Sequence, residues 1–437
     1  MVDTLWPAVG GFMSRQLPFA GMYLTPSHSP GNHRINGQVP ESVMSLSQKL
    51  SHHFVPQYHF RLFMDGKPYI HLAARDGSRF INFASIRGQC ARHKFYGDKR
   101  IENWLGNLED RHAPVFRAVA DIAWNKRTKT LSDEEDHHLR EAILLQRSRT
   151  PRNARIQASS TDQMMLYAYC EYLKALPATS ERQATIEATQ HGKAAVKGSQ
   201  FISLMVSIRI GLQAVGAIAD LSLLILRNHT ATPFIMGDTP CVFSNHYMRA
   251  IRESGVLGLM TPGLMAVLPV DSRTQVLLYD AAVYTPDYSS AGCIDVLHIA
   301  DVSLLNALQI HSAEENVYFS DLSTQAYVRE ILSAHRPILQ DHQGGFAIHY
   351  PGRVLIDGVP NTGEVMHIFE PQVPITLGLS FMSTASLPPN ENPNRPRNPT
   401  LARRLEQSLG MRGESSPIGM DDLARWIESR LYISDGT

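Results

Sequence analysis

The stretch GLMAVLPVDSRTQVLLYD, residues 263–280, holds two apolar runs separated by the polar tripeptide Asp271-Ser272-Arg273. Each run has the aliphatic and β-branched composition of a strand, and Asp and Ser favour tight turns because their side chains bond nearby backbone. The stretch therefore predicts an antiparallel strand pair. Two further segments have strand composition, TPFIMGDTPCVFSN (232–245) and NVYFS (316–320), and the helical pattern VSLLNALQIHSA (302–313) precedes the second.

Upstream of these strands the chain is mostly helical, apart from a predicted hairpin formed by KPYIHLAAR (67–75) and RFINFASIR (79–87). Helices are predicted at 101–126, with a kink or split near Pro114, and from the capping box of Ser132 and Glu135 to the residue before Pro151. Ser160 and Gln163 predict a further helix start, and a long helical region is expected at about 180–226. Its last part, GLQAVGAIADLSLLIL (211–226), is interpreted as a buried core helix. Helical blocks followed by antiparallel strand pairs favour the α+β class.

The composition is that of a globular protein with 41 basic and 41 acidic residues, so no whole-molecule field attracts nucleic acid or an anionic membrane. Four cysteines lie far apart without a CxxC pair, which favours reduced thiols and a cytoplasmic location. No signal peptide and no membrane association are expected. We predict four regions: an irregular arm (1–40), a main α+β domain (41–382), a Pro/Asn-rich linker (383–400) and a short helical tail (401–437). In the tail, Asp421 is expected to cap a helix that carries Leu423, Trp426, Ile427 and Leu431 on one face.

The motif HHFVPQYHF, residues 52–60, supplies the first candidate catalytic residue. Pro56 suits the first turn of a helix, which places His53 just before a helix N-terminus. The positive end of the helix dipole disfavours imidazolium there, so His53 is a candidate general acid or base, and Gln57 is placed to orient a substrate. The alternative is a histidine satisfied by backbone and a glutamine bonded to a neighbouring loop. His52 is interpreted as a surface residue.

Two acids are further candidates for the catalytic set. Asp238 lies in the turn of GDTPC (237–241), from which its carboxylate is predicted to reach a cleft and orient the histidine. An Asp in a turn equally bonds its own backbone two residues on. Glu109, in the helical motif ENWLGNLED (102–110), is the second acid, with a solvated helix face as the alternative.

The segment QRSRTPRNAR (146–155) gathers four arginines in a chain of zero net charge. Guanidinium groups clamp phosphates through paired N–H groups, so Gln146 and Arg149 are predicted to bind substrate. The alternative is that these arginines pair with the acids at 133–136, with Glu141 or with helix carbonyls. Asn306 and Gln309, on an otherwise apolar helix, are predicted either to contact substrate or to close a buried polar network.

At these motifs the chain resembles domain-of-unknown-function family 4238, a microbial family. HFVPQYHFRLF (53–63) is similar to its opening motif, roughly HxVPQxYLxxF, although His59-Phe60 stands where a Tyr/Phe-Leu pair is more usual. The similarity continues in order through KFYG (94–97), ENWLGNLED, LLQRSRTPRNAR (144–155), FIMGDTPCVFSN (234–245), PVDSRTQVLLYD (269–280) and LNALQIHSAEENVYFS (305–320). It covers about residues 50–320. The resemblance locates the motifs of the family in this chain but implies no activity, because the family has none assigned.

Two functions are weighed. The first is a hydrolase for phosphodiester or nucleotide substrates, such as a toxin or defence nuclease, with His53 as general acid/base, Asp238 as its orienter, Arg149 as phosphate clamp and Glu109 or Gln57 completing the pocket. Nucleic acid or a nucleotide would then bind the arginine cluster. The second is a binding or regulatory protein whose C-terminal helix docks a protein partner. No metal site is predicted, because His137 and Glu141 share a helix face without a third ligand. The sequence does not identify a cofactor.

Overall fold

In this computed structural model the described residues are 51–97, 99–196, 198–251, 255–287, 292–339, 345–349, 355–356, 359–360, 365–370, 372–389, 391–392, 395–410, 424–425 and 427–433. By its internal contacts the chain divides into two units. The larger comprises Ser51–Met164 and Gly198–Gln407, and the described part of the smaller lies within Met165–Lys197 and Ser408–Thr437. The predicted arm (1–40) and residues 41–50 of the predicted main domain lie outside the described residues.

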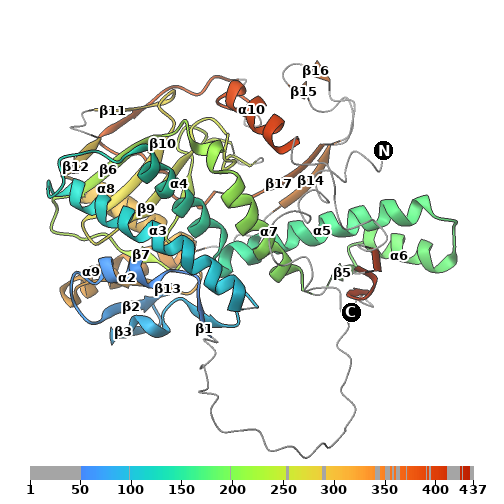
Figure 1. Ribbon diagram of the computed structural model, residues 1–437, viewed down its shortest axis with the longest axis horizontal. Helices are drawn as coiled ribbons and strands as arrows, with labels where there is room; N and C mark the ends of the chain where they lie inside the picture. The colour runs from blue at the N-terminus through green and yellow to red at the C-terminus, as the bar shows by residue number, and fades with distance from the viewer. Residues whose placement is uncertain are drawn as a thin grey trace, which may run out of the picture. The chain divides into compact units, whose positions relative to one another are not determined.

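The fold is α+β, as the sequence predicts (Figure 1). The α-helices are α2 (Gln57–Phe63), α3 (Lys99–Ala123), α4 (Asp133–Ser148), α5 (Pro151–Ala175), α6 (Ser180–Gln190), α7 (Ser199–Gln213), α8 (Ile299–Ser312), α9 (Gln325–His335) and α10 (Pro399–Gly410). Single 3₁₀ turns are η1 (Ile86–Gly88), η2 (Val215–Ile218), η3 (Leu322–Thr324) and η4 (Arg336–Ile338). None of the helices in the described ranges is long and apolar enough to cross a membrane.

A five-stranded sheet forms the centre of the larger unit. Its strands lie in the order β12 (Cys293–Val296), β6 (Ser222–Asn228), β10 (Thr274–Tyr279), β9 (Met265–Pro269) and β8 (Val242–Ser244). β12 runs parallel to β6, and the other neighbours are antiparallel. The β9–β10 pair is the one that residues 263–280 predict, and Asp271 closes its turn by accepting the backbone N–H of Arg273 at 2.7 Å.

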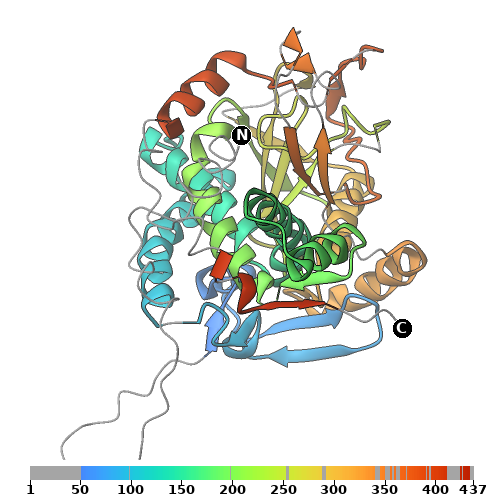
Figure 2. The ribbon, with the colours of Figure 1, turned by 90° about the vertical axis from the view of Figure 1, so that its right-hand side faces the viewer.

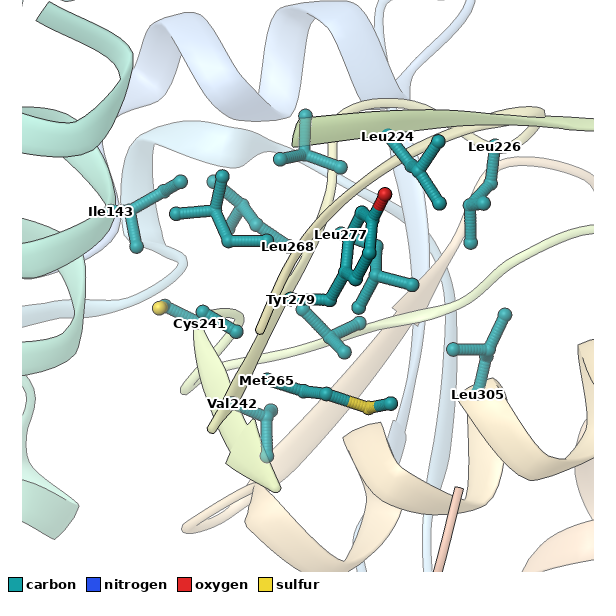
Figure 3. Close-up of a cluster of buried hydrophobic side chains, with 14 of the residues drawn as sticks. Ile143, Leu224, Leu226, Cys241, Val242, Met265, Leu268, Leu277, Tyr279 and Leu305 are labelled. Carbon is teal, nitrogen blue, oxygen red and sulfur yellow. The ribbon is translucent and has the colours of Figure 1, made fainter. Parts of the chain in front are cut away.

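Both faces of this sheet are covered. Every residue of β9 and β10 is buried, which explains why these strands are continuously apolar rather than alternating. The core joins side chains of α3 and α4 to the strands and to α8. Figure 3 shows Ile143 of α4 and Leu305 of α8 in this core, together with Leu268 and Leu277 of the sheet.

A second, antiparallel sheet has the order β3 (Phe80–Ala84), β2 (Ile70–Ala74), β13 (Asn316–Phe319) and β7 (Met236–Gly237). Its β2–β3 hairpin, blue in Figure 2, confirms the predicted one. Val328 and Leu332 of α9 pack with Ala73 and Val317 of this sheet. The remaining strands form pairs: β1 (Ser51–His53) with β4 (Ala91–His93), β11 (Tyr284–Pro286) with β18 (Met382–Thr384), β14 (Gly345–His349) with β17 (Val365–Phe369), β15 (Leu355–Ile356) with β16 (Val359–Pro360), and, in the smaller unit, β5 (Ala194–Val196) with β19 (Leu431–Ile433).

The predicted helical region at about 180–226 does contain α6 and α7, but residues 194–196 form β5 and the part beyond Gln213 is not the expected core helix. α7 ends at Gln213, and the apolar run expected to be a core helix instead supplies β6, the second strand of the central sheet. Periodicity alone does not separate a fully buried strand from a buried helix, and pairing of β6 with both β10 and β12 decides for the strand. Asp220, which interrupts the run, lies in the turn before β6 and pairs with Arg397 at 2.6 Å.

The helix boundaries around Pro151 are partly as predicted. The capping box of Ser132 and Glu135 opens α4, which ends at Ser148. The next helix does not begin at Ser160, however: α5 begins at Pro151, and the hydroxyl of Thr150 accepts the backbone N–H of Asn153 at 3.2 Å. A threonine cap followed by proline outcompetes the weaker signal at Ser160, which lies inside the helix. α3 likewise passes through Pro114 without a split.

The predicted tail is only partly described. Asp421, Leu423 and Trp426 lie outside the described residues, and Ile427 is buried. Leu431 begins β19 and does not continue the helical face, contrary to the prediction. Within the predicted linker, Arg397 is anchored to the larger unit, because its guanidinium donates to the Ala217 carbonyl at 2.7 Å and pairs with Asp220.

Candidate functional site

His53 and Gln57 meet where β1 leads into α2. The pairing of β1 with β4 sets His53 opposite Ala91, and Pro56, extended at φ −69° and ψ 146°, turns the chain into the helix. Pro56 stands just before the helix rather than inside it. The imidazole Nε2 of His53 lies 3.2 Å from the amide nitrogen of Gln57 and 3.1 Å from the carbonyl oxygen of Arg87. The side chains therefore form a contacting pair, with His53 8% exposed and Gln57 partly exposed.

The two neighbours of His53 Nε2 favour different protonation states. The Gln57 amide oxygen accepts from Arg61 at 3.3 Å, which turns the amide N–H₂ toward the ring and suits an unprotonated Nε2. The Arg87 carbonyl suits an N–H at the same nitrogen. A ring nitrogen that has partners both with and without its proton is suited to exchange a proton.

Glu109, Gln146 and Arg149 form one chain of hydrogen bonds beside this pair. The amide nitrogen of Gln146 donates to the Phe54 carbonyl at 2.9 Å, and Arg149 Nε donates to the Gln146 amide oxygen at 3.2 Å. Arg149 Nη1 donates to the Glu109 carboxylate at 2.7 Å. Three predicted residues from α3 and the end of α4 are thus joined to the residue that follows His53.

In this series of hydrogen bonds, the positive charge of Arg149 is compensated by the negative charge of Glu109. Arg149 is 1% exposed, whereas the Glu109 side chain is 26% exposed. Burial by itself lowers the pKa of Arg149, but the Glu109 carboxylate together with Tyr96 and Tyr58 outweighs burial and raises that pKa above its usual value. Arg149 is therefore a charged residue with a fixed partner, not a free guanidinium.

The charge of Arg149 acts on the pKa values of three aromatic residues that the sequence analysis did not select, Tyr58, His59 and Tyr96. Burial raises the pKa values of Tyr58 and Tyr96, and Arg149 opposes this. Burial lowers the pKa of His59 to about 4, so this imidazole stays neutral and donates Nε2 to the Pro269 carbonyl at 2.5 Å. Tyr96 belongs to the KFYG motif and His59 to HFVPQYHFRLF, so their positions in family-like motifs were the available signal. Clusters of perturbed titratable groups are frequent at functional sites and also in structural ion pairs.

His52 is buried, contrary to the prediction of a surface position. It is 2% exposed, its Nδ1 accepts the backbone N–H of Tyr96 at 3.1 Å, and its ring stacks on Tyr96 with centroids 5.8 Å apart. The Tyr96 hydroxyl also donates to the His53 carbonyl at 3.2 Å. The β1–β4 pair directs the two consecutive histidines to opposite sides, and both sides are covered.

Asp238 holds a loop, and its described hydrogen bonds do not go to His53. Its Oδ1 accepts the backbone N–H of Glu314 at 2.6 Å, and its Oδ2 accepts those of Glu315 at 2.7 Å and Asn316 at 2.9 Å. These bonds fix the connection between α8 and β13, a role that neither the orienter prediction nor the Asp-turn alternative includes. Burial raises the pKa of Asp238 to about 6, although the three backbone bonds oppose this.

Asn306 and Gln309 hold the segment that leads to Asp238. Asn306 Oδ1 accepts from Ile235 N at 3.0 Å, and its Nδ2 donates to the Pro233 carbonyl at 3.0 Å. Gln309 accepts from Gly237 N at 3.0 Å and donates to the Pro240 carbonyl at 3.0 Å. On the side that faces α8, residues 233–240 have no neighbouring strand among the described residues. The two side-chain amides make the backbone hydrogen bonds there that a strand would otherwise make. These contacts match the alternative of a buried network rather than a substrate contact.

Two other arginines of 146–155, Arg147 and Arg155, pair with acids from elsewhere in the chain, not with residues 133–136. Arg155 pairs with Glu314 at 3.0 Å, and Arg147 forms an ion pair with Glu370. The acids of 133–136 are used locally, since Glu135 pairs with Arg127 and Asp136 with Arg140. Glu141 contacts His112 at 2.9 Å. Within the described ranges, no three His, Cys, Asp or Glu side chains gather as they would around a metal ion.

Comparisons with known proteins bear on the family and not on the activity. No curated protein matches the chain. No solved structure matches it. A family model described as "Protein of unknown function (DUF4238)" matches residues 51–323, which include His53, Glu109, Gln146, Arg149, Asp238, Asn306 and Gln309. Because this match spans more than half of the chain, the protein belongs to the DUF4238 family.

Proposed function

We propose that the protein is a hydrolase acting on phosphodiester or nucleotide substrates, with His53 as its general acid/base. The observation that carries the proposal is the position of His53 Nε2 between the Arg87 carbonyl and the Gln57 amide nitrogen, at 3.1 and 3.2 Å. This arrangement supports both protonation states of the ring. Water would attack phosphorus and the P–O bond to the leaving group would break, while His53 accepts the proton of the water or gives one to the leaving oxygen.

In this proposal, exposed arginines next to His53 bind the phosphate of the substrate. Arg61 contacts Gln57, and the backbone of Arg87 contacts His53, while both arginine side chains lie at the surface. Both side chains are exposed, so their guanidinium groups can reach a nucleic acid or nucleotide phosphate and bind it by bidentate contact. Arg149 is less suited to that role, because a phosphate would have to displace Glu109 from a guanidinium that is 1% exposed.

Arg149, Gln146 and Glu109 are then positioning residues. They act on His53 through the Phe54 carbonyl, which Gln146 holds at 2.9 Å. Asp238 acts at a further remove, by fixing the loop 314–316. A cytoplasmic location belongs to the same proposal, and its support is that all four cysteines are buried free thiols, as expected in a reducing compartment.

The test is an activity survey of purified protein on single- and double-stranded RNA and DNA and on nucleoside mono-, di- and triphosphates. We expect cleavage of at least one class by the wild type and by His93→Ala, and its loss in His53→Ala. His93 is the matched control because it lies exposed on β4, the partner strand of β1. If every substrate stays intact with wild-type protein, the hydrolase is excluded.

A binding or regulatory protein is the second candidate function. The observation in its favour is that Arg149, Asp238, Asn306 and Gln309 direct their polar atoms to partners within the fold. A protein of this kind would bind nucleic acid or a nucleotide without cleaving it, or dock a protein through its C-terminal segment. Fluorescence anisotropy with the same nucleic acids separates the two, because binding without turnover supports this alternative.

A further inference from the structure

Arg152 is a buried guanidinium with unused donors. It is the second residue of α5 and is 1% exposed. Its Nη1 makes one long hydrogen bond, 3.5 Å, to the Ala313 carbonyl. In the part of the chain that the structure describes, its Nε and Nη2 have no hydrogen-bond partner. A buried donor without a partner is costly, and a charged one more so, which calls for an explanation.

The two unused nitrogens are the pair that binds oxyanions side-on. Nε and Nη2 carry parallel N–H groups along one edge of the planar guanidinium, and this edge matches two oxygens of a carboxylate or phosphate. Arg155, three residues later in α5, shows the same edge in use: its Nε contacts Glu314 Oε1 at 3.0 Å and its Nη2 contacts Glu314 Oε2 at 3.0 Å. One edge is filled by a two-oxygen anion, and the equivalent edge of Arg152 is not.

Three neighbouring guanidinium groups add positive charge around Arg152. Burial, together with the nearby charges of Arg75, Arg147 and Arg155 and opposed by Glu314, lowers the pKa of Arg152 to about 10. Arg152 is therefore still protonated at neutral pH. The acidic partners are already engaged, since Glu314 pairs with Arg155 and Glu370 with Arg147.

We propose that Arg152 is the centre of a buried binding site for a phosphate group, held side-on by Nε and Nη2. A tetrahedral phosphate offers two oxygens to this edge, and its negative charge compensates the buried positive charge of Arg152. Chloride offers a single atom and a single charge. The inference does not depend on the hydrolase, because the site contains neither His53 nor Gln57.

Isothermal titration calorimetry with inorganic phosphate, against chloride at equal ionic strength, tests the site. Wild-type protein and Arg117→Met are expected to bind phosphate with the same affinity. Arg117 is the matched control because it is an exposed arginine, on α3. Arg152→Met keeps the length of the side chain and removes both donors, so its affinity is expected to fall about tenfold or more. Adenosine monophosphate in a parallel titration distinguishes a free phosphate ion from a phosphoryl group carried by a larger ligand.

Two outcomes overturn the proposal: wild-type protein that binds phosphate no better than chloride, or Arg152→Met that binds it as well as wild type. If Arg152→Met does not fold, Arg152→Lys replaces it, because lysine keeps the charge but lacks the planar two-donor edge and is expected to bind about tenfold more weakly. His53→Ala is expected to keep phosphate binding at Arg152. This variant therefore separates failure of the anion site from failure of the hydrolase.

Discussion

The side chains of Arg149 and Glu109 stand 40 positions apart in the sequence and meet at 2.7 Å. This pair joins the end of α4 to α3, and Gln146 carries the connection on to the Phe54 carbonyl beside His53. A helix-packing contact and the conformation of the proposed catalytic segment thus depend on the same ion pair.

The two halves of this pair are expected to differ in their effect on stability. Glu109→Leu leaves a buried guanidinium without its anion and is expected to lower the free energy of unfolding by about 3–5 kcal/mol. Arg149→Met leaves a carboxylate that is 26% exposed and can take up water, so about 1–3 kcal/mol is expected. Urea denaturation of both variants measures the difference. If both variants lose the same free energy of unfolding, Arg149 and Glu109 do not differ in burial as the structure shows.

Asp238 is expected to make stability depend on pH in a defined window. Its folded-state pKa is raised from 3.8 to about 6, chiefly by burial, so the protonated form is favoured in the folded protein. The resulting stabilisation is fully present below about pH 4 and is lost as the pH rises through 6, by about 3 kcal/mol in all.

Asp238→Asn is the variant that isolates this contribution, because asparagine does not titrate. Its amide N–H₂ also faces a backbone N–H that Oδ2 now accepts, so some overall destabilisation is expected. Unfolding midpoints between pH 4 and 7 for both proteins provide the measurement. Curves for wild type and variant that stay parallel across that window would contradict the raised pKa.

Gly237 is expected to tolerate no side chain. A Cβ there would lie 2.9 Å from the Gln309 backbone oxygen and 3.3 Å from the Ala313 Cβ. Because the first contact is with backbone, Gly237→Ala is expected to cost about 1–3 kcal/mol. Gly106→Ala in α3 is the matched control: nothing lies within 4 Å of the added Cβ, and alanine should stabilise the helix by about 1 kcal/mol. Chemical denaturation that shows no loss for Gly237→Ala would argue against the close packing of β7 on α8.

Local signals in the sequence predicted much of the fold. The turn at Asp271, the capping box of Ser132 and the hairpin of β2 and β3 each depend on residues close together in the chain. β6 was mistaken for a helix because its environment is set by β10 and β12, which lie far away in the sequence. A continuous apolar run contains no information about which partners will bury it.

Some of the predicted site residues lie together in the fold, but the sequence did not predict how they are arranged. Glu109, Gln146 and Arg149 do come together, yet the partner of Arg149 is Glu109 and not a free phosphate position. The structural role of Asp238 is to accept backbone N–H groups of residues 314–316. These residues are more than seventy positions away in the sequence, so no local pattern predicts the contact. Arg152 and Arg149 look alike in the sequence. Only the position of Glu109 distinguishes the paired arginine from the one with unused donors.

The central claim is that His53 exchanges a proton during phosphodiester hydrolysis. Its most direct measurement is kcat/KM for the best substrate, or for bis(p-nitrophenyl) phosphate as a chromogenic diester, in His53→Ala and in His93→Ala of equal thermal stability. The account predicts a fall of about 10²–10⁴-fold in His53→Ala and no change in His93→Ala. Wild-type rates in folded His53→Ala would contradict it.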